Sequence, residues 1–173
     1  MKEIKLSKGK VAFVNDSDYE KVNQFKWTVS ECKNNDGVNY YAYRNVPQGD
    51  GTIKSIKLHQ FILGKAPDGM IIDHKNGNGL DNRRRNLRFC TKAENARNSK
   101  IVAGKSIYKG VSWSKHRNRW VAYIRFNNRH IYLGSSKIEK EVALKYDIAA
   151  KLYFGEFANI NFKRDRKSKY TIK

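Results

Sequence analysis

The chain has 173 residues, enough for one or two small domains, and its 39% of hydrophobic residues suffices for compact cores of modest size. Its 36 Lys and Arg against 16 Asp and Glu give a formal charge of +20, which favours nucleic acid as the partner over a membrane surface. The sequence has no apolar run long enough to cross a membrane and no apolar signal region near its start, and its two cysteines are too few for a structural zinc site, so we expect a cytoplasmic protein.

The first segment, roughly residues 1–58, has the pattern of strands separated by turns. β-prone runs predict strands over residues 10–14, 25–29 and 40–43. The run Asn15-Asp16-Ser17-Asp18 is expected to break the first strand, and residues 33–37 are rich in turn formers. Apolar residues at 58, 61 and 62 predict a short amphipathic helix over residues 56–64, closed by Gly64.

The most informative stretch begins at the adjacent pair Asp73 and His74, which follows a β-prone run. Neighbours on a strand point to opposite sides, so one of the two can reach a metal ion while the other faces an attacking water. A loop rich in Asn and Gly then turns the chain, and residues 87–90 return as a second strand. Thr91 with Glu94 is a capping-box pattern, so a helix should start at Thr91 and carry Asn95 in its first turns.

These residue types suit the hydrolysis of a phosphodiester by one divalent ion and one general base. A magnesium-like ion takes oxygen ligands and keeps waters, so one carboxylate and one amide oxygen suffice beside the phosphate. A neutral histidine can accept a proton from water if its other nitrogen is held, either by a backbone carbonyl or by an amide oxygen such as that of Asn86. Arg83, Arg84 and Arg85 in the loop either contact the phosphate or form a solvated surface.

Residues 73–98, DHKNGNGLDNRRRNLRFCTKAENARN, resemble the asparagine-terminated branch of the HNH homing endonucleases, and the similarity extends over roughly residues 4–98. The resemblance implies a strand–strand–helix metal fold that cleaves DNA with one divalent ion, Mg²⁺ or alternatively Mn²⁺. It assigns catalysis to His74 and Asn86 and metal binding to Asp73 and Asn95. Two further candidates are Asn98 and His59, and the latter either contacts phosphate or packs in the interior.

Residues 96–107 look like a linker, and a second pattern begins at Tyr108. Apolar residues alternate with mostly polar ones over 120–127 and again over 130–133, which predicts two strands joined by a turn at Asn127-Asn128. A shorter third strand is expected around Val111. A continuous apolar stripe over residues 142–153 predicts a helix closed by Gly155, whose start is either a capping box of Ser136 and Glu139 or lies one or two residues later.

Residues 108–162 resemble the plant ethylene-response-factor (Apetala-type) DNA-binding domain, through YKGV at 108–111, WVAYIR at 120–125, YLG at 132–134 and YDIAA at 146–150. The resemblance implies a three-stranded sheet whose outer face lies in the major groove of DNA. Carried over by position, the expected DNA contacts are Lys109, Ser112, Ser114, Tyr123, Arg125, His130 and Tyr132. Arg119 is added because it shares the outer face of the sheet by alternation along the strand.

We therefore expect an α+β protein with a nuclease domain over residues 1–98, whose metal-binding core spans about 56–98. A linker over 99–107, a DNA-binding domain over 108–162 and a basic tail over 163–173 complete the predicted organisation. Residues 99–173 carry a formal charge of +13 against +7 for residues 1–98, as expected if the second half binds and the first half cuts.

The expected activity is metal-dependent cleavage of site-recognised duplex DNA by a monomer that nicks one strand, in a bacterial or phage-infected cell. Two other functions stay open at this point. One is a DNA-binding regulator without catalysis, and the other is a basic RNA-binding protein. The role of the N-terminal strands also stays open, since they either extend the DNA contact or support the nuclease core.

Overall fold

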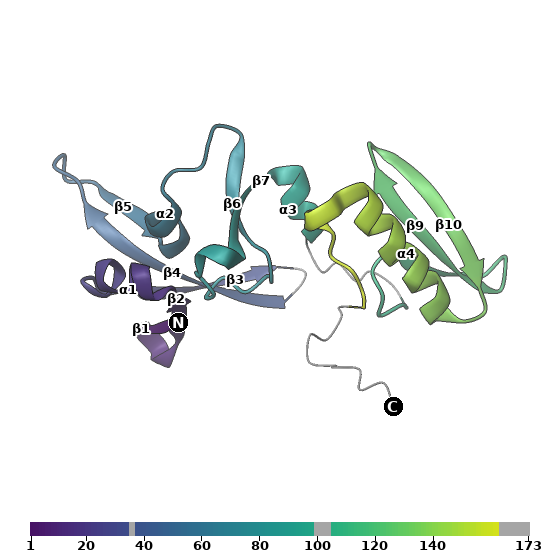
Figure 1. The fold of residues 1–173 in the computed structure, drawn as a ribbon, viewed down its shortest axis with the longest axis horizontal. Helices are drawn as coiled ribbons and strands as arrows, with labels where there is room; N and C mark the ends of the chain where they lie inside the picture. Colours follow the sequence, from purple (N-terminus) through teal and green to yellow (C-terminus); the bar gives the residue numbers. More distant parts are fainter. Residues whose placement is uncertain (35–36, 99–104, 163–173) are drawn as a thin grey trace, which may run out of the picture. The chain divides into compact units, whose positions relative to one another are not determined.

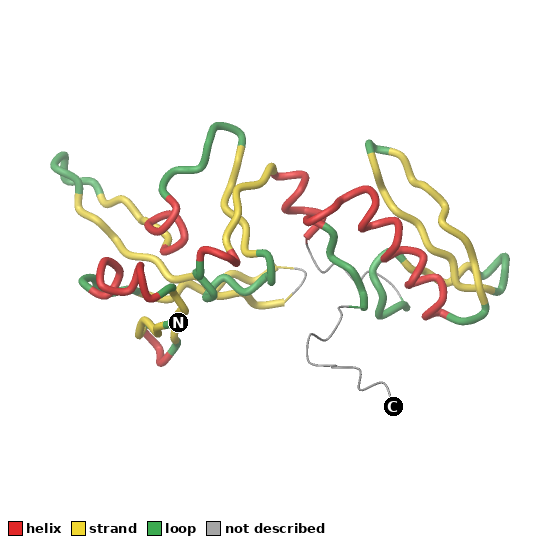
Figure 2. The backbone as a smooth tube through the Cα atoms, viewed as in Figure 1, coloured by secondary structure: helices red, strands yellow, loops and turns green. Residues whose placement is uncertain are grey.

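The computed structural model describes residues 1–34, 37–98 and 105–162 (Figure 1). Contacts divide the chain into two compact units, Met1–Ser99 and Lys100–Lys173, here called unit 1 and unit 2. Both combine small antiparallel sheets with few helices, so the predicted α+β fold class is confirmed (Figure 2). Among the described helices, none has the length and apolar character that a membrane span requires.

Unit 1 begins with a small sheet and a helix that the sequence analysis misses. β1 (Lys2–Lys5) pairs antiparallel with β2 (Val11–Val14). α1 (Asp16–Asn23) follows at once, where we expected only a break. Asn15 stands at its N-cap position, and two aspartates lie in its first turn, where carboxylates interact favourably with the helix dipole. The polar run that ends the strand therefore also starts a helix.

A three-stranded antiparallel sheet follows in the order β3-β4-β5. Its strands are β3 (Thr28–Asn34), β4 (Gly37–Pro47) and β5 (Ile53–Lys57). The strand predicted over residues 25–29 begins only at Thr28. Trp27 before it forms an isolated parallel bridge with Leu6, and its buried indole donates an N–H hydrogen bond to a backbone carbonyl of α1. The predicted turn over 33–37 includes residues 35 and 36, which lie outside the described residues.

The strand–strand–helix predicted from the sequence is present as β6 (Met70–His74), β7 (Leu87–Thr91) and α3 (Lys92–Asn98). The backbone N–H of Glu94 donates to the Thr91 hydroxyl at 3.2 Å, and the Thr91 backbone N–H donates to the Glu94 carboxylate at 2.8 Å, which confirms the predicted capping box. The amphipathic helix before it, α2 (Leu58–Leu63), is closed as expected by Gly64 at φ +84° but begins later than predicted, because residues 56 and 57 belong to the preceding strand β5.

The hydrophobic core of unit 1 comes mainly from the N-terminal elements. Its fully buried side chains include Ile4, Val14 and Val22, which pack with Leu58 of α2 and Leu87 of β7. The loop between β6 and β7 is also fixed to β2, since Phe13 exchanges backbone hydrogen bonds of 2.8 Å with Leu80 and Asn82. The N-terminal segment therefore supports the β6–β7–α3 substructure directly.

Unit 2 is a three-stranded antiparallel sheet, in the order β10-β9-β8, packed against one helix. The strands are β8 (Val111–Ser114), β9 (Arg119–Phe126) and β10 (Arg129–Ser136), and the helix is α4 (Glu139–Phe154). The β9–β10 turn places Asn127 and Asn128 at φ 47° and 61°, as the predicted hairpin requires.

The inner face of the sheet carries Ala122 and Ile124, which are buried against Val142, Ala143 and Ala150 of α4. This face is the one predicted from the alternating pattern. Of the two predicted helix starts, the structure has the later one, because the N-cap residue is Ile138 and not Ser136. The hydroxyl of Ser136 donates to Glu141, not to Glu139, and α4 begins three residues after that serine. The predicted basic tail over 163–173 lies outside the described residues.

Candidate active site

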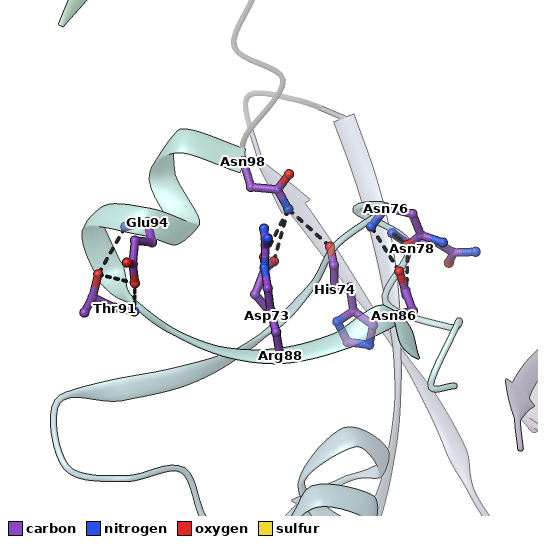
Figure 3. A network of polar contacts seen from close by, with 9 residues as sticks. All are labelled: Asp73, His74, Asn76, Asn78, Asn86, Arg88, Thr91, Glu94 and Asn98. Atoms are coloured by element: carbon purple, nitrogen blue, oxygen red, sulfur yellow. Dashed lines mark hydrogen bonds and ion pairs between the residues drawn. The ribbon is translucent and has the colours of Figure 1, made fainter. Parts of the chain in front are cut away.

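Asp73 and Arg88 lie opposite each other on the paired strands β6 and β7. The Arg88 guanidinium donates two hydrogen bonds of 2.9 and 2.8 Å to Asp73 Oδ2, and the two side chains are only 8% and 7% exposed. Asn98 of α3 adds its amide Nδ2, which lies 3.1 Å from Asp73 Oδ2 and 3.3 Å from Oδ1 (Figure 3). The candidate metal-binding carboxylate is therefore held from a strand and from a helix.

His74 points away from Asp73, as neighbouring strand residues should, and is buried. Its ring packs against two aromatic rings, with centroid distances of 5.1 Å to His59 and 5.9 Å to Tyr41. Burial lowers the pKa of His74, and a hydrogen bond to Asn82 opposes that shift. Burial likewise lowers the pKa of His59 to about 3. Both imidazoles are neutral at physiological pH.

The loop between β6 and β7 is braced by amide side chains. Asn86 Nδ2 donates to Asn76 Oδ1 at 3.0 Å and to the Asp81 carbonyl at 2.7 Å, and its Oδ1 accepts the Asn76 backbone N–H at 3.1 Å (Figure 3). The expected contact between the Asn86 amide oxygen and His74 is therefore wrong, because this oxygen is directed into the loop. Asn82 takes that position, with Oδ1 3.4 Å from His74 Nε2.

Two of the three candidate arginines are already paired with carboxylates. Arg83 forms two hydrogen bonds of 2.6 Å with Asp81, and Arg84 forms a salt bridge of 2.6 Å with the buried Asp18 of α1. These pairs fix the end of the loop to the body of unit 1. Arg85 is exposed and makes no hydrogen bond or ion pair within the described residues, so it is the arginine best available to a phosphate.

The helix α3 carries Asn95 and Asn98, and Asn98 contacts the strand pair. Asn98 contacts Asp73 and also donates to the His74 carbonyl at 3.3 Å. Asn95 lies three residues earlier, hence on the same side of the helix, and is partly exposed. The structure thus gives the tentative candidate Asn98 a direct contact with the carboxylate, whereas no side-chain hydrogen bond of Asn95 is found within the described residues.

The donor set suits a hard divalent ion. The described residues contain no group of three or more His, Cys, Asp or Glu side chains that could hold a metal, so a softer, nitrogen- or sulfur-rich site is not formed there. Asp73 and Asn95 offer one carboxylate and one amide oxygen, and a phosphate and waters can complete an octahedral shell. The residues present therefore fit a magnesium-like ion.

In unit 2, strand pairing brings most of the candidate DNA contacts onto the face opposite α4, which we call the outer face. Tyr123 pairs with Tyr132, Arg125 with His130, and Ser114 with Arg119. Ser112 shares this face, while Lys109 precedes β8 and its backbone is held by the side chain of Asn161. The two tyrosines are 37% and 45% exposed, with ring centroids 5.4 Å apart.

Several side chains of both candidate sites were not predicted from the sequence. Arg88 could have been found from the expected β6–β7 pairing, had the register been known. Tyr41 and Asn82 carry no local signal, because their contacts depend on how β4 and the loop meet β6. On the outer face, the Arg117 guanidinium lies 5.2 Å from the centre of the Tyr132 ring, a cation–π arrangement that alternation along the strands cannot predict.

Comparison with known proteins gives matches to both units. A family model described as HNH endonuclease matches residues 58–97. The chain is 28% identical over 159 residues to an uncharacterised HNH endonuclease of Acanthamoeba polyphaga mimivirus, covering 89% of this chain and 76% of that protein. It is 32% identical over 106 residues to Protein 3.8 of Escherichia phage T7, covering 61% of this chain and 87% of that protein. An AP2-like ethylene-responsive transcription factor of Arabidopsis thaliana is 38% identical over 78 residues, which cover 44% of this chain but only 23% of that protein.

Proposed function

The chain belongs to the HNH endonuclease family and carries an AP2-like unit C-terminal to the nuclease unit in the sequence, and we therefore propose that it is a metal-dependent DNA endonuclease of the homing type. It binds a recognised site in duplex DNA through unit 2 and hydrolyses a phosphodiester at the Asp73–His74 site of unit 1. The observation that carries the proposal is the meeting of a held carboxylate, a neutral buried histidine and an amide-bearing helix on one strand pair.

His74 is the proposed general base. Burial keeps its imidazole neutral, so the ring can accept a proton from the attacking water at physiological pH. The rings of His59 and Tyr41 pack against the His74 ring and restrain its orientation. The base is therefore already oriented before the substrate binds. Asn86 acts indirectly, because it fixes the loop that connects the two strands of the site.

Asp73 and Asn95 are the proposed ligands of the divalent ion, which we take to be Mg²⁺, with Mn²⁺ as the alternative. When bound, the ion neutralises charge that develops on the phosphate and on the leaving oxygen. Arg88 and Asn98 fix the orientation of the Asp73 carboxylate. Arg85, which is exposed in the loop between β6 and β7, is the proposed contact to a neighbouring phosphate.

Unit 2 is the proposed DNA-binding domain. Its outer face combines exposed Tyr, Arg, Ser and His side chains on a sheet whose other face is closed by α4. Base edges in the major groove are read by hydrogen-bonding side chains, and a small β-sheet can enter that groove. A formal charge of +13 over residues 99–173 adds attraction to phosphates that does not depend on sequence.

A single catalytic site per chain leads us to propose that a monomer nicks one strand and that a double-strand break needs a second site. We further propose that the protein acts in the cytoplasm of a bacterial or phage-infected cell. Its two cysteines are unpaired, as expected in a reducing compartment.

The test is relaxation, by the purified chain with and without Mg²⁺, of supercoiled plasmids that carry random or host genomic duplex segments, because cleavage needs a recognised site. We expect nicked circles only with the ion, and we expect His74→Ala to abolish nicking while duplex binding, measured by gel shift, stays within about two-fold. Nicking that persists in a carefully purified His74→Ala preparation would refute the assignment of the base. Duplex binding by the unaltered chain without nicking under any divalent ion would favour a DNA-binding regulator instead.

A further inference from the structure

Asn82 is a fully buried polar residue next to the candidate base. Its side chain is 0% exposed and makes two contacts, one to His74 Nε2 at 3.4 Å and one to the Gly79 carbonyl at 3.3 Å. A carbonyl can only accept, so the amide NH₂ group must face Gly79. The amide oxygen must then face His74, and the orientation of the Asn82 amide follows from its own partners.

The backbone around Asn82 is anchored to β2. The Asn82 N–H donates to the Phe13 carbonyl at 2.8 Å, and the Phe13 N–H donates to the Leu80 carbonyl at 2.8 Å. Residues 75–78 of the same loop are exposed, so Asn82 belongs to the rigid interior while the neighbouring part of the loop faces solvent. The amide oxygen therefore has a defined position relative to the His74 ring.

An amide oxygen accepts hydrogen bonds and cannot donate them, whereas a neutral imidazole has one N–H and one lone pair. Two acceptors at 3.4 Å would repel each other, so His74 Nε2 must carry the hydrogen. We propose that Asn82 is a positioning residue that holds His74 in the Nε2–H tautomer, which makes Nδ1 the nitrogen that accepts the proton from water. The second part of this proposal rests on the proposed nuclease function, and the first part does not.

The rings of Tyr41 and His59 cannot make this selection. They lie at interplanar angles of 59° and 80° to the His74 ring, and ring packing restrains the plane without distinguishing its two nitrogens. Only a hydrogen-bonding group discriminates between the tautomers. Loss of the amide oxygen should therefore leave the His74 ring in place but allow both tautomers.

The test uses the full chain with ¹⁵N-labelled histidine at neutral pH. Long-range ¹H–¹⁵N correlation distinguishes the imidazole nitrogen that carries hydrogen from the one that does not, and His74→Gln identifies the His74 signals among the four histidines. We expect a single Nε2–H tautomer in the unaltered protein. In Asn82→Leu, which keeps a similar volume without an acceptor, we expect averaged shifts from two tautomers.

Two further variants complete the test. Asn78→Ala removes an exposed amide of the same loop that accepts the Leu80 N–H, and it should leave the His74 signals unchanged. Asn82→Asp retains an oxygen facing His74 but sets its second oxygen against the Gly79 carbonyl, so either this carboxyl group binds a hydrogen or His74 carries hydrogens on both nitrogens. In both cases a hydrogen should remain on His74 Nε2. If the active-site assignment also holds, Asn82→Leu should lower kcat about 100-fold while KM for DNA stays nearly constant.

An Nδ1–H tautomer in the unaltered protein overturns the proposal, even if Asn82→Leu does not fold. An unchanged His74 spectrum in a folded Asn82→Leu protein overturns it as well. The spectra do not depend on cleavage, so the predicted tautomers in a protein that fails to nick DNA would refute the nuclease assignment and leave the positioning role of Asn82 intact.

Discussion

The polar side chains of the candidate active site in unit 1 and those of the outer face in unit 2 differ in how many of their hydrogen-bonding groups are paired within the protein. Asp73, His74 and Asn86 are buried, and each is bonded to other side chains or to the backbone. Tyr123 and Arg125, in contrast, are exposed on a sheet whose other face is closed. Groups that act on a bond must be oriented before the substrate arrives, whereas groups that hold a polymer can stay solvated until it does.

The largest expected difference between buried and exposed polar groups comes from removing one buried and one exposed arginine. Arg88→Met leaves Asp73 buried without its cation, and we expect a loss of about 3–5 kcal/mol in the free energy of unfolding in the absence of divalent ions. The control Arg85→Met removes an exposed arginine and should change stability by less than about 0.5 kcal/mol. Urea unfolding measures both, and equal stabilities would contradict the buried pair.

On the outer face, removing an arginine should lower the affinity for DNA and not the stability of the fold. Arg125→Ala should weaken duplex binding by about 1–3 kcal/mol and leave the free energy of unfolding nearly unchanged. Lys151→Ala on the exposed side of α4 removes the same charge from the far side of the sheet and serves as the matched control. Fluorescence anisotropy at fixed salt measures the affinities. A similar loss in both variants would mean that only overall charge matters.

The buried histidines of unit 1 make its stability depend on pH. His59 has a pKa of about 3 in the folded protein against 6.5 for the free side chain, mainly because it is buried. Between these values the unfolded chain binds a proton that the folded chain excludes, so stability falls on acidification by about 1.4 kcal/mol per pH unit. His59→Phe should flatten this slope, as measured by urea unfolding at several pH values below 6.5. An unchanged slope would contradict the burial of His59.

The smallest expected effect concerns the helix that carries the amide side chains of the active site. Thr91→Ala removes the hydroxyl that accepts the Glu94 N–H, which should cost about 1 kcal/mol. Thermal unfolding measures the loss. Ser136→Ala near the start of α4 is a useful comparison, because α4 has no side-chain cap at its N-cap residue and should lose less. A larger loss from Ser136→Ala would reverse this ranking.

The elements that follow a simple period could be predicted from the sequence. The sheet and helix of unit 2 carry their apolar faces in the local pattern, and β6 and β7 are β-prone runs. The helix α3 has no buried residue, and it could be predicted because its Thr91–Glu94 cap is local, as is the Gly64 cap of α2. The helix α1 was missed because the polar run at 15–18 ends one element and begins the next. Local pattern cannot distinguish those two roles.

The contacts inside the active site were less predictable. The adjacency of Asp73 and His74 is visible in the sequence, but the partner of each is set by three-dimensional packing. Arg88 depends on the strand register, and Asn82 depends on the attachment of the loop to β2. The misassigned contact of Asn86 has the same origin, since several asparagines in one loop compete for few hydrogen-bonding positions and only the folded loop selects among them.

The distribution of the hydrophobic core in unit 1 bears on protein engineering. A fragment of residues 58–97, fused to another DNA-binding domain, would lack Ile4, Val14 and Val22. It would therefore lose most of the hydrophobic core against which its own strands pack. Such a graft should be recovered as an aggregate or an unfolded peptide. The smallest fragment of unit 1 that should fold after transfer to another protein therefore begins at β1.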